Sequence, residues 1–192
     1  MKRSKWTQGS IFIILAMLVI IGAYYTLTRH PVQAEPEAKE TVVGGLISMN
    51  LERNYPPSPK EVVKLFSDIT KCFYNEEYTD EELVELAHKI QEIYDDELIA
   101  NETEEQYLRT LRSDIGNFKT QEITISSYAT SSSTDVDYFS EDGFEWARLY
   151  CVYTIRKGTQ LGAMNQVFLL RKDANGHWKI YGWQPADDDD AA

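Results

Sequence analysis

The longest hydrophobic run of the chain lies near its N-terminus. Ser10–Leu27 contains no charged residue, and every position from Ile11 to Ile21 is apolar. A bilayer core of about 30 Å needs roughly 20 helical residues. Aromatic residues stand at both ends of the run, as is typical of the two membrane interfaces. The pattern therefore predicts a transmembrane signal-anchor helix over residues 10–28.

Basic residues indicate the orientation of this helix. Lys2, Arg3 and Lys5 precede it, and short segments rich in Lys and Arg stay in the cytoplasm. We therefore expect a single-pass protein of the cell membrane, with residues 1–9 in the cytoplasm and the C-terminal domain outside. A signal peptide cleaved after Ala34 is the alternative. The apolar run, however, exceeds the roughly 7–15 residues of such a peptide.

Three later segments have the apolar spacing of amphipathic helices. Ser58, Thr79 and Thr103 mark their starts, each followed three residues later by Glu or Gln, as in a capping box. Pro59 occupies the first helical position behind Ser58. The apolar stripes comprise Val62, Leu65, Phe66, Ile69, Cys72 and Phe73; Leu83, Leu86, Ala87, Ile90, Ile93 and Tyr94; and Tyr107, Leu108, Leu111, Ile115 and Phe118.

After the third helix the pattern changes to that of strands. Strands are predicted over 122–130, 144–156, 163–172 and 177–184, with the turn Asp173–Gly176 between the last two. Alternation in the long strand separates Leu149, Cys151, Tyr153 and Ile155 from Trp146, Tyr150 and Val152. In the last strand it separates Trp178 and Ile180 from Tyr181 and Trp183. Helices first and an antiparallel meander afterwards predict an α+β domain, in which three helices pack on a curved four-stranded sheet.

Charge and composition complete the domain plan. The net charge is −12, and without the first 30 residues there are 15 basic and 31 acidic residues. Such acidity disfavours nucleic acid as a partner. Residues 29–57 are predicted to form an extracytoplasmic stalk, with an unassigned apolar patch at Val42–Ile47, and residues 58–185 the domain. Residues 186–192 form an acidic tail that we expect to be disordered.

The last hairpin carries a resemblance. An apolar strand, the sequence Asp173-x-Asn175-Gly176-x-Trp178-Lys179-Ile180 and a closing aromatic strand are similar to the end of many NTF2-like (cystatin-like) α+β domains. The order of elements over residues 58–185 resembles that superfamily as well. The resemblance implies a cone of helices and curved sheet, whose open end holds a ligand or a partner. The whole layout resembles single-pass membrane proteins of Gram-positive bacteria.

Candidate chemistry is sparse. The sequence has no Walker loop, GxGxxG, HExxH or GxSxG, and His30, His88 and His177 lack metal-ligand spacing. We therefore expect neither a metal nor a cofactor, and no catalytic residue carries over from NTF2-like enzymes. Asp68 and Asp114 lie near helical core faces. They are either solvated or general-base candidates inside the cone.

Aromatic residues and the two cysteines are the other candidates. Trp146, Tyr150, Trp178 and Trp183 either line a ligand pocket or belong to the core. Cys72 and Cys151 fall on core faces. Outside the cell they could form a disulfide that closes a loop of about 80 residues, and otherwise they are buried thiols.

Two functions are compatible with these features. The first is a membrane-anchored, extracytoplasmic, non-enzymatic module that binds an extracytoplasmic protein or a small apolar ligand, with a homodimer also compatible. The alternative is a cone-pocket enzyme, similar to an isomerase or dehydratase, that acts on a small hydrophobic substrate. An open cavity with a carboxylate among aromatics would favour the enzyme, and a filled cone would favour the module.

Overall fold

The computed structural model describes residues 41–186, which belong to one compact unit that begins at Thr41. The predicted transmembrane segment 10–28, the residues before it and the first part of the stalk lie outside the described residues. So does nearly all of the acidic tail. Within the described range, every helix is too short or too polar to cross a bilayer.

Helices form the first half of the described chain. The three predicted helices are present as α3, α4 and α6, and the capping side chains of Ser58, Thr79 and Thr103 accept backbone N–H groups as expected. Two short helices, α2 and α5, were not predicted. The bounds are α2 Val42–Ile47, α3 Pro59–Asn75, α4 Asp80–Gln91, α5 Asp96–Ala100 and α6 Glu104–Thr120.

The predicted boundary between stalk and domain is wrong. Residues 41–57 are part of the fold, because Val43, Leu46 and Leu51 are buried in the main core. The Tyr55 hydroxyl also donates to the Trp178 carbonyl at 2.9 Å. The helix α2 spans fewer than two turns, so its apolar pattern is too short to be distinguished from a linker patch, and packing on α3 and α4 stabilises it.

Five strands form one antiparallel sheet in the order β1-β3-β4-β5, with β2 paired to the N-terminal part of β3. The sequence predicted four. The strand that the sequence did not predict is β2. Four of its five residues are exposed, so its sequence lacks the apolar alternation of a half-buried strand and resembles a polar loop. The bounds are β1 Ile123–Thr130, β2 Asp137–Glu141, β3 Phe144–Lys157, β4 Gln160–Lys172 and β5 Trp178–Pro185, with a 3-10 turn at Ser133–Asp135.

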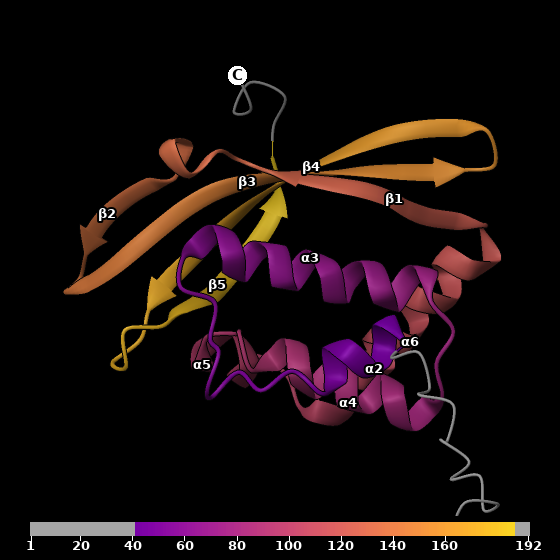
Figure 1. Cartoon of the computed structure of the whole chain (residues 1–192), viewed down its shortest axis with the longest axis horizontal. Helices are drawn as coiled ribbons and strands as arrows, with labels where there is room; N and C mark the ends of the chain where they lie inside the picture. Colours follow the sequence, from indigo (N-terminus) through magenta and orange to yellow (C-terminus); the bar gives the residue numbers. More distant parts are fainter. Residues whose placement is uncertain (1–40, 187–192) are drawn as a thin grey trace, which may run out of the picture. The chain divides into compact units, whose positions relative to one another are not determined.

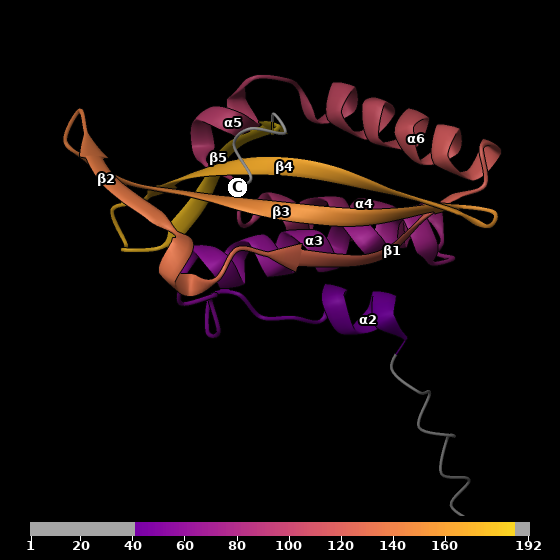
Figure 2. The same cartoon turned by 90° about the horizontal axis from the view of Figure 1, so that it is seen from above.

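The helices cover one face of this sheet (Figure 1). The helix α3 lies directly against the strands, and from above α2 and α6 flank the α3–α4 pair on opposite sides (Figure 2). Alternation in β3 is confirmed: Leu149, Cys151 and Tyr153 are fully buried beneath the helices, whereas Tyr150 and Val152 are half-buried on the other face. A layer of amphipathic helices thus packs on one face of the sheet, and the two layers enclose a single hydrophobic core.

Two β-bulges interrupt the alternation. One follows Ile125 in β1, so that Ile125 and Tyr128 both face the helices. The other is at Tyr181 in β5, where Ile180 pairs with Leu170 and Gly182 with Leu169. An extra residue in one strand reverses the facing of every residue after it.

The hairpin between β4 and β5 is confirmed. The Asp173 side chain accepts hydrogen bonds from the backbone N–H groups of Asn175 and His177, and Gly176 has a φ of +84°. A side chain with a Cβ resists that conformation, which explains the glycine. The turn brings Trp178 back beside Lys172 at the start of β5.

A buried ion pair ties the helix layer to the sheet at β5. The backbone of Ile180 exchanges hydrogen bonds with Ile93 and Asp95 on either side of Tyr94. The Arg171 guanidinium then donates to both Asp95 carboxylate oxygens, at 2.6 and 3.0 Å, and only 6% of the Asp95 side chain is exposed. Aromatic rings of Phe144, Trp146 and Tyr181 surround the guanidinium.

This pair yields a test of stability. Arg171→Ala should lower the free energy of unfolding by roughly 3 kcal/mol, because it leaves a buried, uncompensated carboxylate. The matched control is Arg112→Ala, whose partner Asp80 is 76% exposed in the ion pair; it should lower that free energy by less than about 1 kcal/mol. Urea unfolding of both variants measures the difference, and equal losses would contradict the structural role of Arg171.

Candidate functional site

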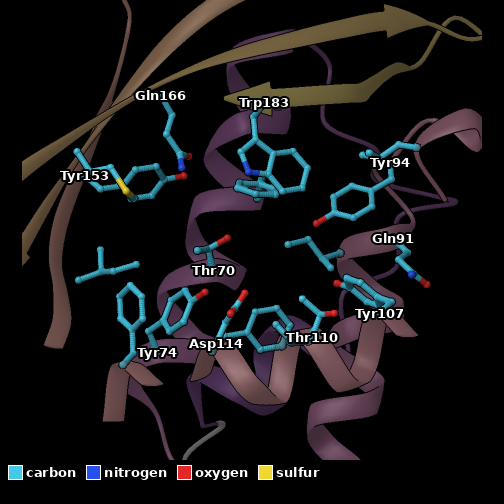
Figure 3. A pocket seen from close by; sticks show the side chains of 18 of the residues that line it. Thr70, Tyr74, Gln91, Tyr94, Tyr107, Thr110, Asp114, Tyr153, Gln166 and Trp183 are labelled. Atoms are coloured by element: carbon cyan, nitrogen blue, oxygen red, sulfur yellow. The ribbon is translucent and has the colours of Figure 1, made fainter. Parts of the chain in front are cut away.

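A pocket of about 420 Å³ lies between the helices and the inner face of the sheet. Side chains from α3, α4, α5, α6 and four strands point into it (Figure 3). Its lining comprises Phe66, Thr70, Phe73, Tyr74, Ile90, Gln91, Tyr94, Leu98, Ile99, Glu102, Tyr107, Thr110, Leu111, Asp114, Phe118, Ile125, Tyr153, Ile155, Met164, Gln166 and Trp183. The volume is within the range of about 300–1,000 Å³ that small-molecule sites occupy.

Aromatic rings form much of the wall. The Trp183 ring lies 4.9 Å from the ring of Phe66 and 5.7 Å from that of Tyr94, between centroids. On the α6 side, Tyr74 and Phe118 stack at 4.1 Å. Rings that contact one another restrict each other's rotamers, so the pocket is largely pre-formed.

Of the four aromatics predicted to line a pocket, only Trp183 does so. Trp146 and Tyr150 lie on the opposite face of the sheet, because alternation in β3 turns Leu149 and Cys151 toward the helices. Trp178 shares the helix-covered face with Ile180, as predicted, but packs against the core beside Tyr138. The two tryptophans of β5 thus differ, since Trp178 packs against the core and Trp183 lines the pocket.

Trp183 reaches the pocket through the bulge in β5. Strict alternation predicted that it lies on the face opposite Ile180. The extra residue at Tyr181 instead brings Trp183 opposite Phe168, which is fully buried on the helix side. Tyr181 points to the other face, where its ring lies 5.1 Å from that of Trp146. Trp183 therefore lines the pocket, and the prediction of its face was wrong.

Four tyrosine hydroxyls, those of Tyr74, Tyr94, Tyr107 and Tyr153, are among the polar groups of the lining. Burial raises the pKa of Tyr107 to about 12 and raises the pKa of Tyr94 well above its usual range. Tyr94 and Tyr107 also share a side-chain hydrogen bond. Burial, and then the nearby Asp114 carboxylate, raise the pKa of Tyr74. These phenols therefore stay protonated at neutral pH and serve as hydrogen-bond donors, not as bases.

The two acidic candidates have different environments. Asp114, on α6, lines the pocket, and Figure 3 shows it beside Tyr74 and facing Thr70. Asp68 does not line it. This carboxylate accepts a hydrogen bond of 2.6 Å from the Tyr128 hydroxyl at the exposed edge of α3. The only other charged residue in the lining is Glu102, which precedes α6.

The sequence did not identify several of the residues that line the pocket. Tyr94 and Tyr107 were assigned to apolar stripes, and Tyr74, Gln91 and Gln166 were not singled out. One feature of the sequence could have indicated a polar pocket, namely a tyrosine at a core position that an aliphatic residue could fill. A buried tyrosine carries a hydroxyl that needs a hydrogen-bond partner. Which of the chain's 12 tyrosines face a cavity depends on how the helices pack.

Cys72 and Cys151 are separate free thiols in the structure, both buried. The disulfide considered from sequence is therefore not formed there. Cys151 lies 3.6 Å from the Ser67 hydroxyl, which also pairs with the Tyr153 hydroxyl at 2.7 Å. Within residues 41–186, no group of three His, Cys, Asp or Glu side chains is arranged to hold a metal ion.

Thiol reactivity tests this arrangement. Burial raises the pKa of Cys72 to about 11 and also raises the pKa of Cys151, so little reactive thiolate exists at pH 8. The native full chain should resist iodoacetamide at pH 8, while an exposed Ser113→Cys thiol reacts. In guanidinium, without reductant, both native cysteines should become alkylated. Alkylation only after reduction would instead establish the disulfide.

Comparison with known proteins identifies a family for this chain. Residues 1–183 match the family model described as "Domain of unknown function (DUF6715)". The match includes both the N-terminal apolar segment and the α+β domain. No curated protein matches the chain.

Proposed function

The chain belongs to this family, the domain of unknown function DUF6715, and we propose that it is a membrane-anchored, extracytoplasmic module that binds a small apolar ligand. The single observation that carries the proposal is the pocket of about 420 Å³, with aromatic walls and a few convergent polar groups. Such a combination is the usual composition of a small-molecule site.

The polar groups of the pocket favour binding over catalysis. Its tyrosines have raised pKa values, which make them poor acids and poorer nucleophiles near neutral pH. Among the lining residues that the structure describes there is no His, Cys, Lys or Ser. Hydroxyls and the amides of Gln91 and Gln166 can orient a ligand, and the rings can exclude water from it.

An enzyme is the second candidate, and one observation favours it. The cavity is open and holds a carboxylate, Asp114, among aromatic rings, the arrangement that we expected of a cone-pocket enzyme from sequence. Asp114 would act as a general base and a neighbouring tyrosine as a hydrogen-bond donor to the developing charge. Time-resolved mass analysis of any ligand that binds distinguishes the two candidates, because only an enzyme converts the ligand.

The membrane location and the wider relationship belong to the same proposal. The uncharged run over residues 10–28 and the basic residues before it support a single span with the domain outside. Helices on one face of a five-stranded antiparallel sheet, with a pocket between them, support a relationship to NTF2-like domains. The acidity of the outer part should keep it away from anionic lipid.

Filling the pocket tests the binding function. Thr110 is an exposed residue of α6 that lines the pocket, so Thr110→Trp should occupy its volume without disturbing the core. We expect the full chain, in phosphatidylcholine nanodiscs, to bind the neutral probe 4-phenylbutanol in calorimetry. The variant should bind it at least tenfold more weakly. Ser113→Trp, on an exposed position of the same helix outside the lining, is the control and should bind as the parent does.

Protease accessibility tests the topology. Protease added to intact cells without a wall should remove the domain, since the basic N-terminus predicts that the domain is outside. Complete protection would overturn this orientation. Release of a soluble form that begins at Glu35 would select the cleaved signal peptide in place of the anchor.

A further inference from the structure

The charged groups at the pocket all have one sign. The lining contains two carboxylates, Asp114 and Glu102, and no described Lys, Arg or His. Each carboxylate acts on a pocket phenol: Asp114 contributes to the raised pKa of Tyr74, and Glu102 to that of Tyr107. Both carboxylates are therefore close enough to influence what enters.

Neither of these two carboxylates has a cationic partner within residues 41–186. Asp95 and Glu97 pair with Arg171, Asp80 pairs with Arg112, and Glu104 lies 2.8 Å from His88. No described cation lies within ion-pair distance of Asp114 or Glu102. The charge of the described lining residues is therefore negative, and no ion pair neutralises it.

Aromatic rings stand beside Asp114. Tyr74 lies next to it (Figure 3), and Phe118 follows one turn later on α6 and stacks on Tyr74. The faces of aromatic rings carry negative charge and attract cations such as ammonium groups. An unpaired carboxylate beside aromatic rings is thus complementary to a cation that carries an apolar body.

The same surroundings disfavour an anion. A ligand carboxylate or phosphate would lose water and meet only carboxylates, ring faces and neutral donors. Phenols and amides can donate hydrogen bonds to it, but no described lining residue supplies a full positive charge. Burying a charge without a counter-charge is unfavourable.

We infer that the ligand is an amphiphilic amine: a protonated amine whose head lies beside Asp114 and whose apolar body lies against the rings of Tyr94 and Trp183. The inference rests on the proposed function and names its ligand class. Asp114 would pair with the ammonium, and the ring of Tyr74 would supply cation–π attraction. Glu102 precedes α6, more than three helical turns before Asp114, and would raise the local concentration of cations without touching the head.

Three probes of one skeleton test the inference in the full chain in phosphatidylcholine nanodiscs, with empty nanodiscs as the blank. They are 4-phenylbutylamine as the cation, 4-phenylbutanol as the neutral probe and 4-phenylbutyrate as the anion. We expect the amine to bind five- to tenfold more tightly than the alcohol, and the butyrate more weakly than either. Asp114→Asn should abolish the preference for the amine and leave the affinity for the alcohol within about twofold.

Glu105→Gln is the matched control, because it removes one negative charge from an exposed position of the same helix outside the lining. An equal loss of amine affinity in this variant would mean that long-range charge, not Asp114, attracts the amine, and would overturn the inference. Equal binding of amine and alcohol, or tightest binding of the butyrate, would also overturn it while supporting a pocket that binds ligands. Binding of none of the three would overturn the proposed function itself.

Discussion

The contact between the end of α4 and the edge strand β5 is the constraint on which the site depends. Ile180 uses both of its edge-facing backbone groups on Ile93 and Asp95, and Arg171 then neutralises the buried Asp95 carboxylate. An edge strand with unpaired groups would otherwise be open to another chain. Here the helix layer covers those groups, and the same contact holds Tyr94 where it faces the pocket. A buried ion pair is costly unless every partner is in place, so this corner is fixed in one arrangement.

This contact and the bulge in β5 position two of the aromatic rings that line the pocket. Tyr94 is anchored by the Ile180 bridge, and Trp183 is turned toward it by the bulge at Tyr181. On the other side α6 carries Tyr107 and Asp114 but buries little of itself, since Ile115 is its one fully buried residue among those described. The helix α6 therefore forms one wall of the pocket, and its side chains do not fill the pocket volume. A filled core would give more stability by close packing, and the open space is the observation on which the proposed ligand binding rests.

The chemistry of the pocket and the charge of the molecule are consistent with each other. Rings provide apolar contact, phenols held neutral by burial provide hydrogen bonds, and unpaired carboxylates provide the only charge among the lining residues described. None of these groups is activated as a nucleophile. This combination is the basis of the proposal that the pocket selects its ligand by shape and by sign of charge.

Local pattern alone was enough for the helices α3, α4 and α6, their caps, the Asp173–Gly176 turn and the buried face of β3, because these depend on neighbours within a few residues. Tertiary packing decided the rest. The segment 41–57 joins the fold only through contacts of Val43 and Leu46 with distant helices, and β2 exists only beside β3. Of the aromatics that the sequence leaves open between pocket and core, Trp183 lines the pocket, Trp178 packs against the core, and Trp146 and Tyr150 lie on the other face of the sheet. Alternation along a strand predicts which face of the sheet each side chain occupies, but only as far as the next bulge. The bulge at Tyr181 results from the pairing of β5 with β4 and from the hydrogen bonds of Ile180 with the segment that follows α4. The physical reason is that a strand's facing is determined by its partners across the sheet, which lie far away in sequence.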